Sequence, residues 1–236
     1  LFWRQWSAGV PNRWELIVFD WDGTLMDSTG AIVRAAERAI DDLGLPKLPS
    51  ERIREIIGLG LRESWDSLFP GRGLDGYRDF VDRYRDHFVN SERLTIKPYP
   101  GVESLIESLH SRGVRLAVAT GKSRRGLDRD LEENSFGRFF EHSVTSDEAP
   151  SKPHPEMLLR IMRRLGVRAD RTLMVGDTEF DLRMARDARV SAVAVTWGAH
   201  DRARLLASEP MACLDAMEDL APWLENFEAE PDEDLG

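Results

Sequence analysis

The chain has 236 residues, an apolar fraction of 42% and a formal net charge of −10 at pH 7. This length allows one large domain or two modest ones, and the apolar fraction is sufficient for a buried core. The negative charge argues against a nucleic-acid surface, which needs clustered Lys and Arg. No apolar run approaches the ~18 residues that would cross a bilayer, so we expect a soluble protein with no membrane or nucleic-acid partner.

The remaining compositional signals concern the compartment and the two ends of the chain. A lone cysteine, Cys213, cannot form an intramolecular disulfide, which is typical of a reducing cytoplasm. Residues 1–13 carry aromatic side chains among polar ones without a signal-peptide pattern. Residues 225–236 are acidic and poor in apolar side chains. Both ends are expected to be flexible.

The first predicted element is an apolar strand over residues 16–19, which leads into Asp20, Asp22, Gly23 and Thr24. A residue at the carboxyl end of a buried strand projects into the crevice where open α/β sheets bind ligands. Asp20 is therefore placed as a nucleophile, and Asp22 becomes the candidate acid and base. Gly23 can adopt a positive φ, which would turn the chain so that both carboxylates converge. The alternative is an ordinary acidic turn, because Asp-Gly is common turn chemistry.

A purely helical segment follows. Apolar residues at helical spacing predict four helices in succession, the second of them capped by Ser50 and carrying Ile53, Ile56 and Ile57. Two prolines and a glycine at residues 98–101 then interrupt the pattern. We predict a helical cap domain over residues 28–96, inserted above the crevice where a lid belongs. The predicted helices cover residues 30–43, a stretch from residue 50, residues 61–68 and residues 74–89.

Strands return after residue 101 and alternate with helices. This alternation predicts right-handed crossovers and a parallel sheet. The expected fold is therefore α/β, a doubly wound parallel sheet with a Rossmann-like core. Its domain would be discontinuous, formed by residues 14–27 and 97–224. The later strands are expected at residues 115–120, 142–145, 172–175 and 191–196.

Three further segments place polar side chains next to this sheet. Thr120 and Gly121 end an apolar strand, although Thr is also a common strand residue. Lys152 precedes a helix whose first turn suits Pro155, and helix N-termini favour anions, although most lysines simply lie on the surface. A fourth strand leads to Asp177 and Asp181, which share a face if a helix starts between them. The candidates here are Thr120, Gly121, Lys152, Asp177 and Asp181.

Several carboxylates at one sheet edge would repel one another by ~4 kcal/mol per pair at 4 Å and an effective dielectric of 20. Cations are therefore expected among them, and hard oxygen ligands suit Mg²⁺. We expect Asp20 and Asp177 to be direct ligands, together with the backbone carbonyl of Asp22. Asp181 could either bind the metal ion directly or hold the ligating side chains in place from outside the coordination sphere.

The ordered segments around Asp20, Thr120, Lys152 and Asp177 resemble the four motifs of the haloacid dehalogenase superfamily. Residues 121–128 and 152–157 are similar to the phosphoglycolate phosphatase-like branch, which has a helical cap. The resemblance implies a phosphatase acting on a small phosphorylated metabolite, phosphoglycolate being the first guess, through an aspartyl phosphate.

In such a family member the first aspartate, here Asp20, attacks phosphorus. The second, Asp22, protonates the leaving oxygen and then deprotonates the hydrolytic water, while Thr120 and Gly121 hold the phosphoryl oxygens. One departure is Arg189, where relatives frequently have glycine, and this puts the local turn geometry in doubt.

Other functions stay open. Asp22 argues against dehalogenation, since halide departure needs no acid, but a phosphomutase uses the same aspartyl phosphate. A receiver-type binding or signalling module with a persistent phosphoaspartate is a further alternative. Within the cap, Arg62 is a candidate to bind an anionic part of the substrate, or else it forms a solvated pair with Glu63. The oligomeric state cannot be predicted from the chain.

Overall fold

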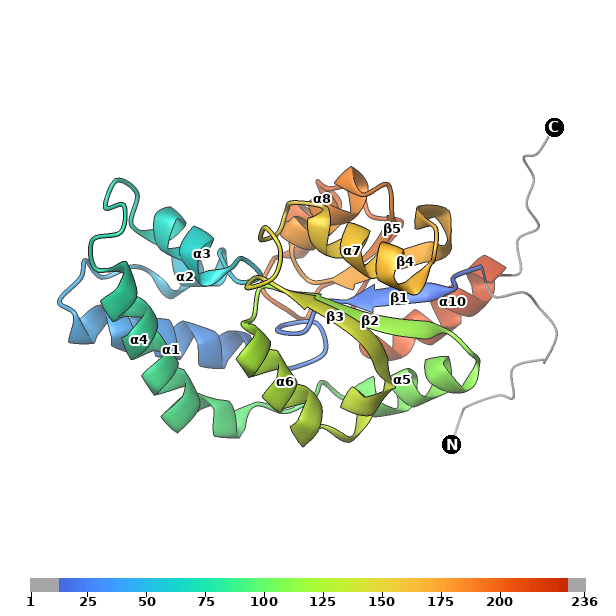
Figure 1. The fold of residues 1–236 in the computed structure, drawn as a ribbon, viewed down its shortest axis with the longest axis horizontal. Helices are drawn as coiled ribbons and strands as arrows, with labels where there is room; N and C mark the ends of the chain where they lie inside the picture. The colour runs from blue at the N-terminus through green and yellow to red at the C-terminus, as the bar shows by residue number, and fades with distance from the viewer. Residues whose placement is uncertain (1–12, 229–236) are drawn as a thin grey trace.

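The computed structural model describes residues 13–228, which form a six-stranded sheet with helices on both faces and a helical segment beyond the carboxyl ends of the strands (Figure 1). The strand order is β3-β2-β1-β4-β5-β6, and every neighbouring pair is parallel. This confirms the doubly wound α/β fold. The strands are β1 (Leu16–Phe19), β2 (Arg115–Thr120), β3 (Phe140–Thr145), β4 (Thr172–Gly176), β5 (Ser191–Val195) and β6 (Ala212–Leu214).

The strand order places a topological switch point between β1 and β4. Connections leave these two strands in opposite directions across the sheet, so a crevice opens at their carboxyl ends, where open α/β sheets bind ligands. Asp20 and Asp177 are the residues that directly follow these two strands. The sheet therefore brings the first and fourth predicted segments to one place.

Side chains that alternate along the strands fill two separate core layers, because successive strand residues point to opposite faces. Ile17 and Phe19 pack with α5 (Val102–Ser111), α6 (Arg124–Glu133) and α10 (Leu220–Glu228). Leu16 and Val18 pack on the other face with α7 (Glu156–Leu165), α8 (Glu179–Asp187) and α9 (Arg202–Leu206). Near-continuous apolar strands are the expected pattern for a sheet buried on both faces.

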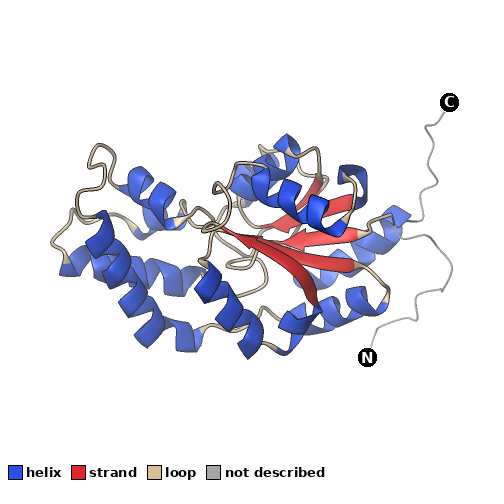
Figure 2. Cartoon of the chain, viewed as in Figure 1, coloured by secondary structure: helices blue, strands red, loops and turns tan. Residues whose placement is uncertain are grey.

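The helical segment has its own apolar core. It contains α1 (Thr29–Asp42), α2 (Ser50–Arg54), α3 (Leu61–Leu68) and α4 (Tyr77–His87), followed by the π-helix η1 (Phe88–Glu92) and the 3₁₀-helix η2 (Arg93–Thr95). Figure 2 shows these helices at the end of the sheet toward which the strands run. Trp65 is fully buried there, with its ring centroid 4.7 Å from that of Phe69 and 5.4 Å from that of Phe80. This arrangement supports the division into a core and a cap over residues 28–96, which we keep as a proposal.

Three details differ from the sequence expectations. Ser50 is the first residue of α2 and not its cap, because its hydroxyl donates to Glu37 at 2.5 Å. Ile56 and Ile57 lie beyond the end of α2 at Arg54, in a turn that still buries both side chains. Strand β6 has three partly exposed residues, too few for a periodic signal, and was missed.

Of the two chain ends, the structure describes only residue 13 of the N-terminal segment and residues 225–228 of the C-terminal one. Helix α10 extends to Glu228, so the first residues of the acidic segment are helical and not an irregular tail. Residues 1–12 and 229–236, expected to be flexible, lie outside the described residues. Arg189 has a φ of 58°, in the left-handed region that glycine adopts most easily. The doubt about that turn was therefore justified. No helix in the described part combines the length and apolarity needed to cross a membrane.

We predict that Trp65→Ala destabilises the helical segment selectively. Removing a fully buried indole costs about 3–5 kcal/mol, and the aromatic partners of Trp65 lie within the helical segment between β1 and α5. Hydrogen exchange should accelerate in α1 to α4 and remain unchanged in β1 to β5. Leu74→Ala is the control, because Leu74 belongs to the same segment but is 66% exposed. Equal acceleration throughout the sheet would contradict a separately packed cap.

Candidate active site

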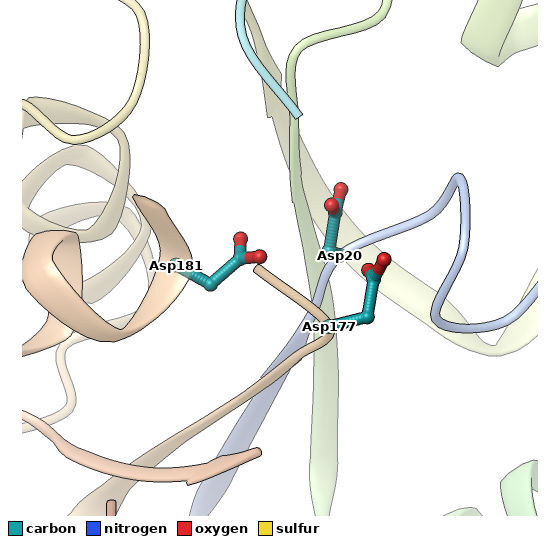
Figure 3. Close-up of side chains that lie close together, drawn as sticks. All are labelled: Asp20, Asp177 and Asp181. Atoms are coloured by element: carbon teal, nitrogen blue, oxygen red, sulfur yellow. The ribbon is translucent and has the colours of Figure 1, made fainter. Parts of the chain in front are cut away.

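Three aspartates meet at the switch point of the sheet. One carboxylate oxygen from each of Asp20, Asp177 and Asp181 lies within 4.8 Å of the others, and all three side chains are buried. In Figure 3, Asp20 and Asp177 extend from the ends of their strands, and Asp181 reaches toward them from α8. Residues far apart in the sequence thus form one compact acidic cluster.

A buried lysine balances part of this charge. The Nζ atom of Lys152 lies 2.8 Å from Oδ1 of Asp20 and 2.6 Å from Oδ1 of Asp181. Its side chain is fully buried, so the surface-lysine alternative is wrong for this residue. One ammonium faces three carboxylates, and at separations near 4 Å each uncompensated repulsion is worth ~4 kcal/mol at an effective dielectric of 20. The cluster therefore needs further positive charge when all its carboxylates are ionised.

The same imbalance appears in the pKa values of the aspartates. Burial raises the pKa of Asp20 well above its ordinary value, and the charge of Lys152 opposes that rise. Burial and the neighbouring charge of Asp181 raise the pKa of Asp177 to about 7, although Thr24 Oγ1 and the Ala199 amide donate to its two oxygens at 2.6 and 2.7 Å. A cation bound among these oxygens would reverse both shifts.

The donor set fits a hard divalent cation. The side chains that could ligate a cation, Asp20, Asp177 and Asp181, all offer carboxylate oxygens, which Mg²⁺ prefers. Oδ1 of Asp20 accepts a hydrogen bond from the Trp21 amide at 2.6 Å, whereas Oδ2 is buried without a hydrogen-bond partner among the described residues. A buried, unpartnered carboxylate oxygen is costly. Oδ2 is therefore the free position of the cluster.

Asp181 has a different environment. Its Oδ2 accepts from the backbone amide of Thr178 at 3.1 Å and from the Thr178 hydroxyl at 2.7 Å, as part of a capping box at the start of α8. Its Oδ1 faces Lys152. Both oxygens are thus engaged by the protein, which favours the anchoring role for Asp181 over direct ligation.

The turn after β1 depends on Gly23. This residue has a φ of 84°, as its glycine identity predicts, and a Cβ there would lie 2.3 Å from Oδ2 of Asp177. Thr24 donates to the same Asp177 side chain. The Asp-Gly turn is therefore part of the site and not merely a solvated loop.

Asp22 lies outside the acidic cluster and has a cationic partner that the sequence reading missed. Nζ of Lys122 lies 3.1 and 3.0 Å from the two carboxylate oxygens of Asp22 and 3.2 Å from Oδ2 of Asp130. The side chains are only 8%, 14% and 13% exposed, respectively. The available signal was a lysine two residues after Thr120, at the start of the connection to α6.

Thr120 and Gly121 stand where the helical segment meets the sheet. Thr120 is buried at the end of β2, and its hydroxyl accepts from the Lys122 amide at 3.2 Å. A Cβ on Gly121 would lie 2.6 Å from the carbonyl oxygens of both Gly58 and Leu59. Only glycine allows this approach, so the Gly58–Leu59 loop packs directly on the predicted phosphoryl-binding turn.

Two hydrogen bonds link the helical segment to the core beside this loop. The Gly60 amide donates to Ser151 Oγ at 2.7 Å. Nδ1 of His200 accepts from the Glu179 amide at 3.0 Å, which leaves Nε2 to donate to the Glu55 carbonyl at 3.1 Å. His200 therefore links the helical segment to the start of α8 through its two ring nitrogens.

Arg62 is placed differently from the other candidates. Its Nε donates to Asp66 at 2.8 Å, one turn along α3, and its guanidinium lies 5.5 Å from the ring centroid of Tyr77. It is not among the residues that line the cavity containing Asp20 and Asp22. Its partner is Asp66 and not Glu63, and its assignment to a substrate stays a prediction.

The fold thus joins a parallel doubly wound core to a helical insertion after β1, with an acidic cluster and a buried lysine at the carboxyl ends of the strands. The family model described as haloacid dehalogenase-like hydrolase matches residues 17–195. The chain belongs to this family, and the resemblance stated from its motifs is confirmed.

Individual relatives place the chain more closely. It is 35% identical over 211 residues to a probable phosphatase, IndB, of Dickeya dadantii, covering 87% of this chain and 91% of that one. It is 31% identical over 219 residues to a phosphoglycolate phosphatase of Pseudomonas putida, covering 88% and 78%. The crystal structure of a predicted phosphatase from Clostridium acetobutylicum superposes with a TM-score of 0.81 at 23% identity, covering 90% and 99%, which shows the shared fold.

We predict that Lys152→Met destabilises the protein by about 3–5 kcal/mol, because removing one partner leaves buried carboxylates uncompensated. Denaturant unfolding without divalent cations measures this loss. Adding Mg²⁺ should restore part of it, by ~2.7 kcal/mol at a concentration of one hundred times the Kd.

Lys47→Met is the matched control. Lys47 is 85% exposed and lies 3.4 Å from Asp41 at the surface, where an ion pair contributes at most about 1 kcal/mol. If Lys152→Met unfolds at the same denaturant concentration as Lys47→Met, the electrostatic account of the cluster is wrong.

Proposed function

We propose that this hydrolase is a Mg²⁺-dependent phosphatase that cleaves a small phosphate monoester through an aspartyl-phosphate intermediate. The observation that carries the proposal is Oδ2 of Asp20, which is buried, lacks a hydrogen-bond partner in the described structure and borders the cavity. Lys152 holds the Asp20 side chain in place through an ion pair. Asp177 supplies a further carboxylate oxygen that could bind a cation. Phosphoglycolate is the substrate class that the family resemblance implies.

In the first half-reaction, Oδ2 of Asp20 attacks phosphorus and the bond from phosphorus to the leaving oxygen breaks. Asp22 donates a proton to that oxygen, so the product leaves as an alcohol. The Thr120 hydroxyl and the Gly121 amide donate hydrogen bonds to the phosphoryl oxygens. Asp20 and Asp22 line the same cavity as Thr120 and Gly121, which supports these roles.

In the second half-reaction, Asp22 takes a proton from water, and the water oxygen attacks phosphorus. The bond to Asp20 breaks, releasing inorganic phosphate and regenerating the carboxylate. Lys152 holds Asp20 in position through its contact at 2.8 Å. Asp20, Asp177 and the Asp22 carbonyl would hold the Mg²⁺ ion, whose charge would offset the repulsion between the nucleophile and an anionic phosphate.

Lys122 gives Asp22 a defined position in this scheme. Both carboxylate oxygens contact its ammonium group, which restrains a side chain that must reach first the leaving oxygen and then a water. Asp130 holds the other side of the same ammonium group. Lys122 therefore acts as a positioning residue for Asp22.

We predict that Asp20→Asn removes phosphate release below detection, because an amide cannot form the phosphoenzyme. Asp22→Asn should lower kcat by about 10²–10⁴, the usual contribution of general acid–base catalysis. Release of inorganic phosphate from a panel of phosphomonoesters, with Mg²⁺ and with a chelator, measures both. Asp128→Asn is the control, since Asp128 is exposed and pairs with Arg124 on α6.

The same assay separates the alternatives. Retained turnover in Asp20→Asn would exclude the covalent mechanism, and turnover undiminished by chelator would exclude the metal. A phosphomutase would isomerise a sugar phosphate without net phosphate release. A persistent phosphoaspartate with no turnover would instead identify the binding or signalling module.

The proposal also covers the partner and the cellular compartment. The partner is a small phosphorylated metabolite, and the setting is a reducing cytoplasm, in keeping with Cys213 as a free thiol.

A further inference from the structure

The cavity above Asp20 extends from the sheet edge into the helical segment. It has a volume of about 410 Å³, within the range of pockets that hold organic ligands. Asp20, Asp22 and Thr120 line its inner end. A leaving group attached to a phosphate at Asp20 must therefore occupy the remainder of this space.

That remainder is predominantly apolar. Ile32 comes from α1, Ile56 and Ile57 from the turn after α2, Leu61 from α3, and Phe80 from α4, and Phe88 follows α4. The same side chains belong to the apolar clusters of the helical segment or pack against them. A leaving group here would exchange water for hydrocarbon surface, which favours apolar groups by about 25 cal/mol for each Å² buried.

The charged groups in the cavity do not offer a free buried cation. Lys122 is engaged by Asp22 and Asp130 at 3.0 and 3.2 Å. Arg85 and Arg125 also line the cavity, but both are exposed, and solvent weakens the ion pairs that exposed arginines form. Arg129 lines it as well, with a side chain that is 28% exposed and an Nε atom 3.8 Å from Oδ1 of Asp130. Arg62 is outside the lining. Charge recognition of a leaving group would therefore depend on cations that are exposed or already paired.

We propose that the preferred substrate is a phosphate monoester of an apolar alcohol, with an alkyl or aromatic body. This inference rests on the proposed phosphatase function, and it takes the lining of the cavity, and not the resemblance to phosphoglycolate phosphatases, as the guide to the substrate. The phosphate would lie at Asp20, and the apolar body would extend along Ile57 and Leu61 toward Phe80. Specificity would then come from burial of hydrocarbon and not from charge recognition.

A series of ethyl, butyl and hexyl phosphate tests this class against phosphoglycolate. The alkyl leaving alcohols have nearly the same acidity, so differences in rate report on binding in the cavity. We expect kcat/KM to rise about four-fold for each buried methylene, mainly through a lower KM. The kcat/KM for hexyl phosphate should exceed that for phosphoglycolate.

Two cap variants form a matched pair. Leu61 and Leu45 are both partly buried leucines packed on the same apolar cluster, but only Leu61 lines the cavity. Leu61→Gln should lower the ratio of kcat/KM for hexyl phosphate to kcat/KM for ethyl phosphate about ten-fold. Leu45→Gln should leave this ratio unchanged.

The outcomes distinguish failure of the apolar substrate class from failure of the phosphatase function. Hydrolysis of phosphoglycolate in preference to hexyl phosphate, or an alkyl series without a trend, overturns the apolar substrate class and leaves the phosphatase function intact. No Mg²⁺-dependent phosphate release from any ester overturns the proposed function itself. Because the wild-type series is decisive alone, the inference stays testable even where Leu61→Gln fails to fold.

Discussion

The organisation of the site depends on one electrostatic constraint, the burial of three carboxylates around a single ammonium group. Lys152 contacts Asp20 and Asp181 directly, whereas Asp177 relies on hydrogen bonds from Thr24 and Ala199. The parallel sheet, packed on both faces, holds these charges in fixed positions, so part of their repulsion stays uncompensated. The remaining negative charge makes the same cluster suitable for a divalent cation.

The helical segment completes this arrangement from above. Its loop approaches Gly121 at a distance that excludes a side chain, and its backbone contacts Ser151 and His200 at the sheet edge. The candidate catalytic residues thus line a cavity whose other lining residues are mainly apolar. In the function proposed above, the core supplies charge at fixed points, and the helical segment supplies the surface that a leaving group would contact.

Residues with strict local requirements were the most predictable. The apolar strand before Asp20, the left-handed Gly23 and the strained turn at Arg189 follow from rules that apply within a few residues. Ser50 shows where such rules fail, since a partner on a neighbouring helix replaced its capping interaction. Lys122 was overlooked for a similar reason, because Asp22 and Asp130 are its partners only in three dimensions.

The alternation of strands and helices was predictable from the chain, since periodicity and turn chemistry are encoded locally, and the family was predictable from the ordered motifs. The burial of Lys152 between two aspartates, the pairing of Arg62 with Asp66 and the mainly apolar lining of the cavity became visible in the folded molecule. The physical reason is that burial, ion pairing and cavity shape arise from packing between distant segments, which no local pattern specifies.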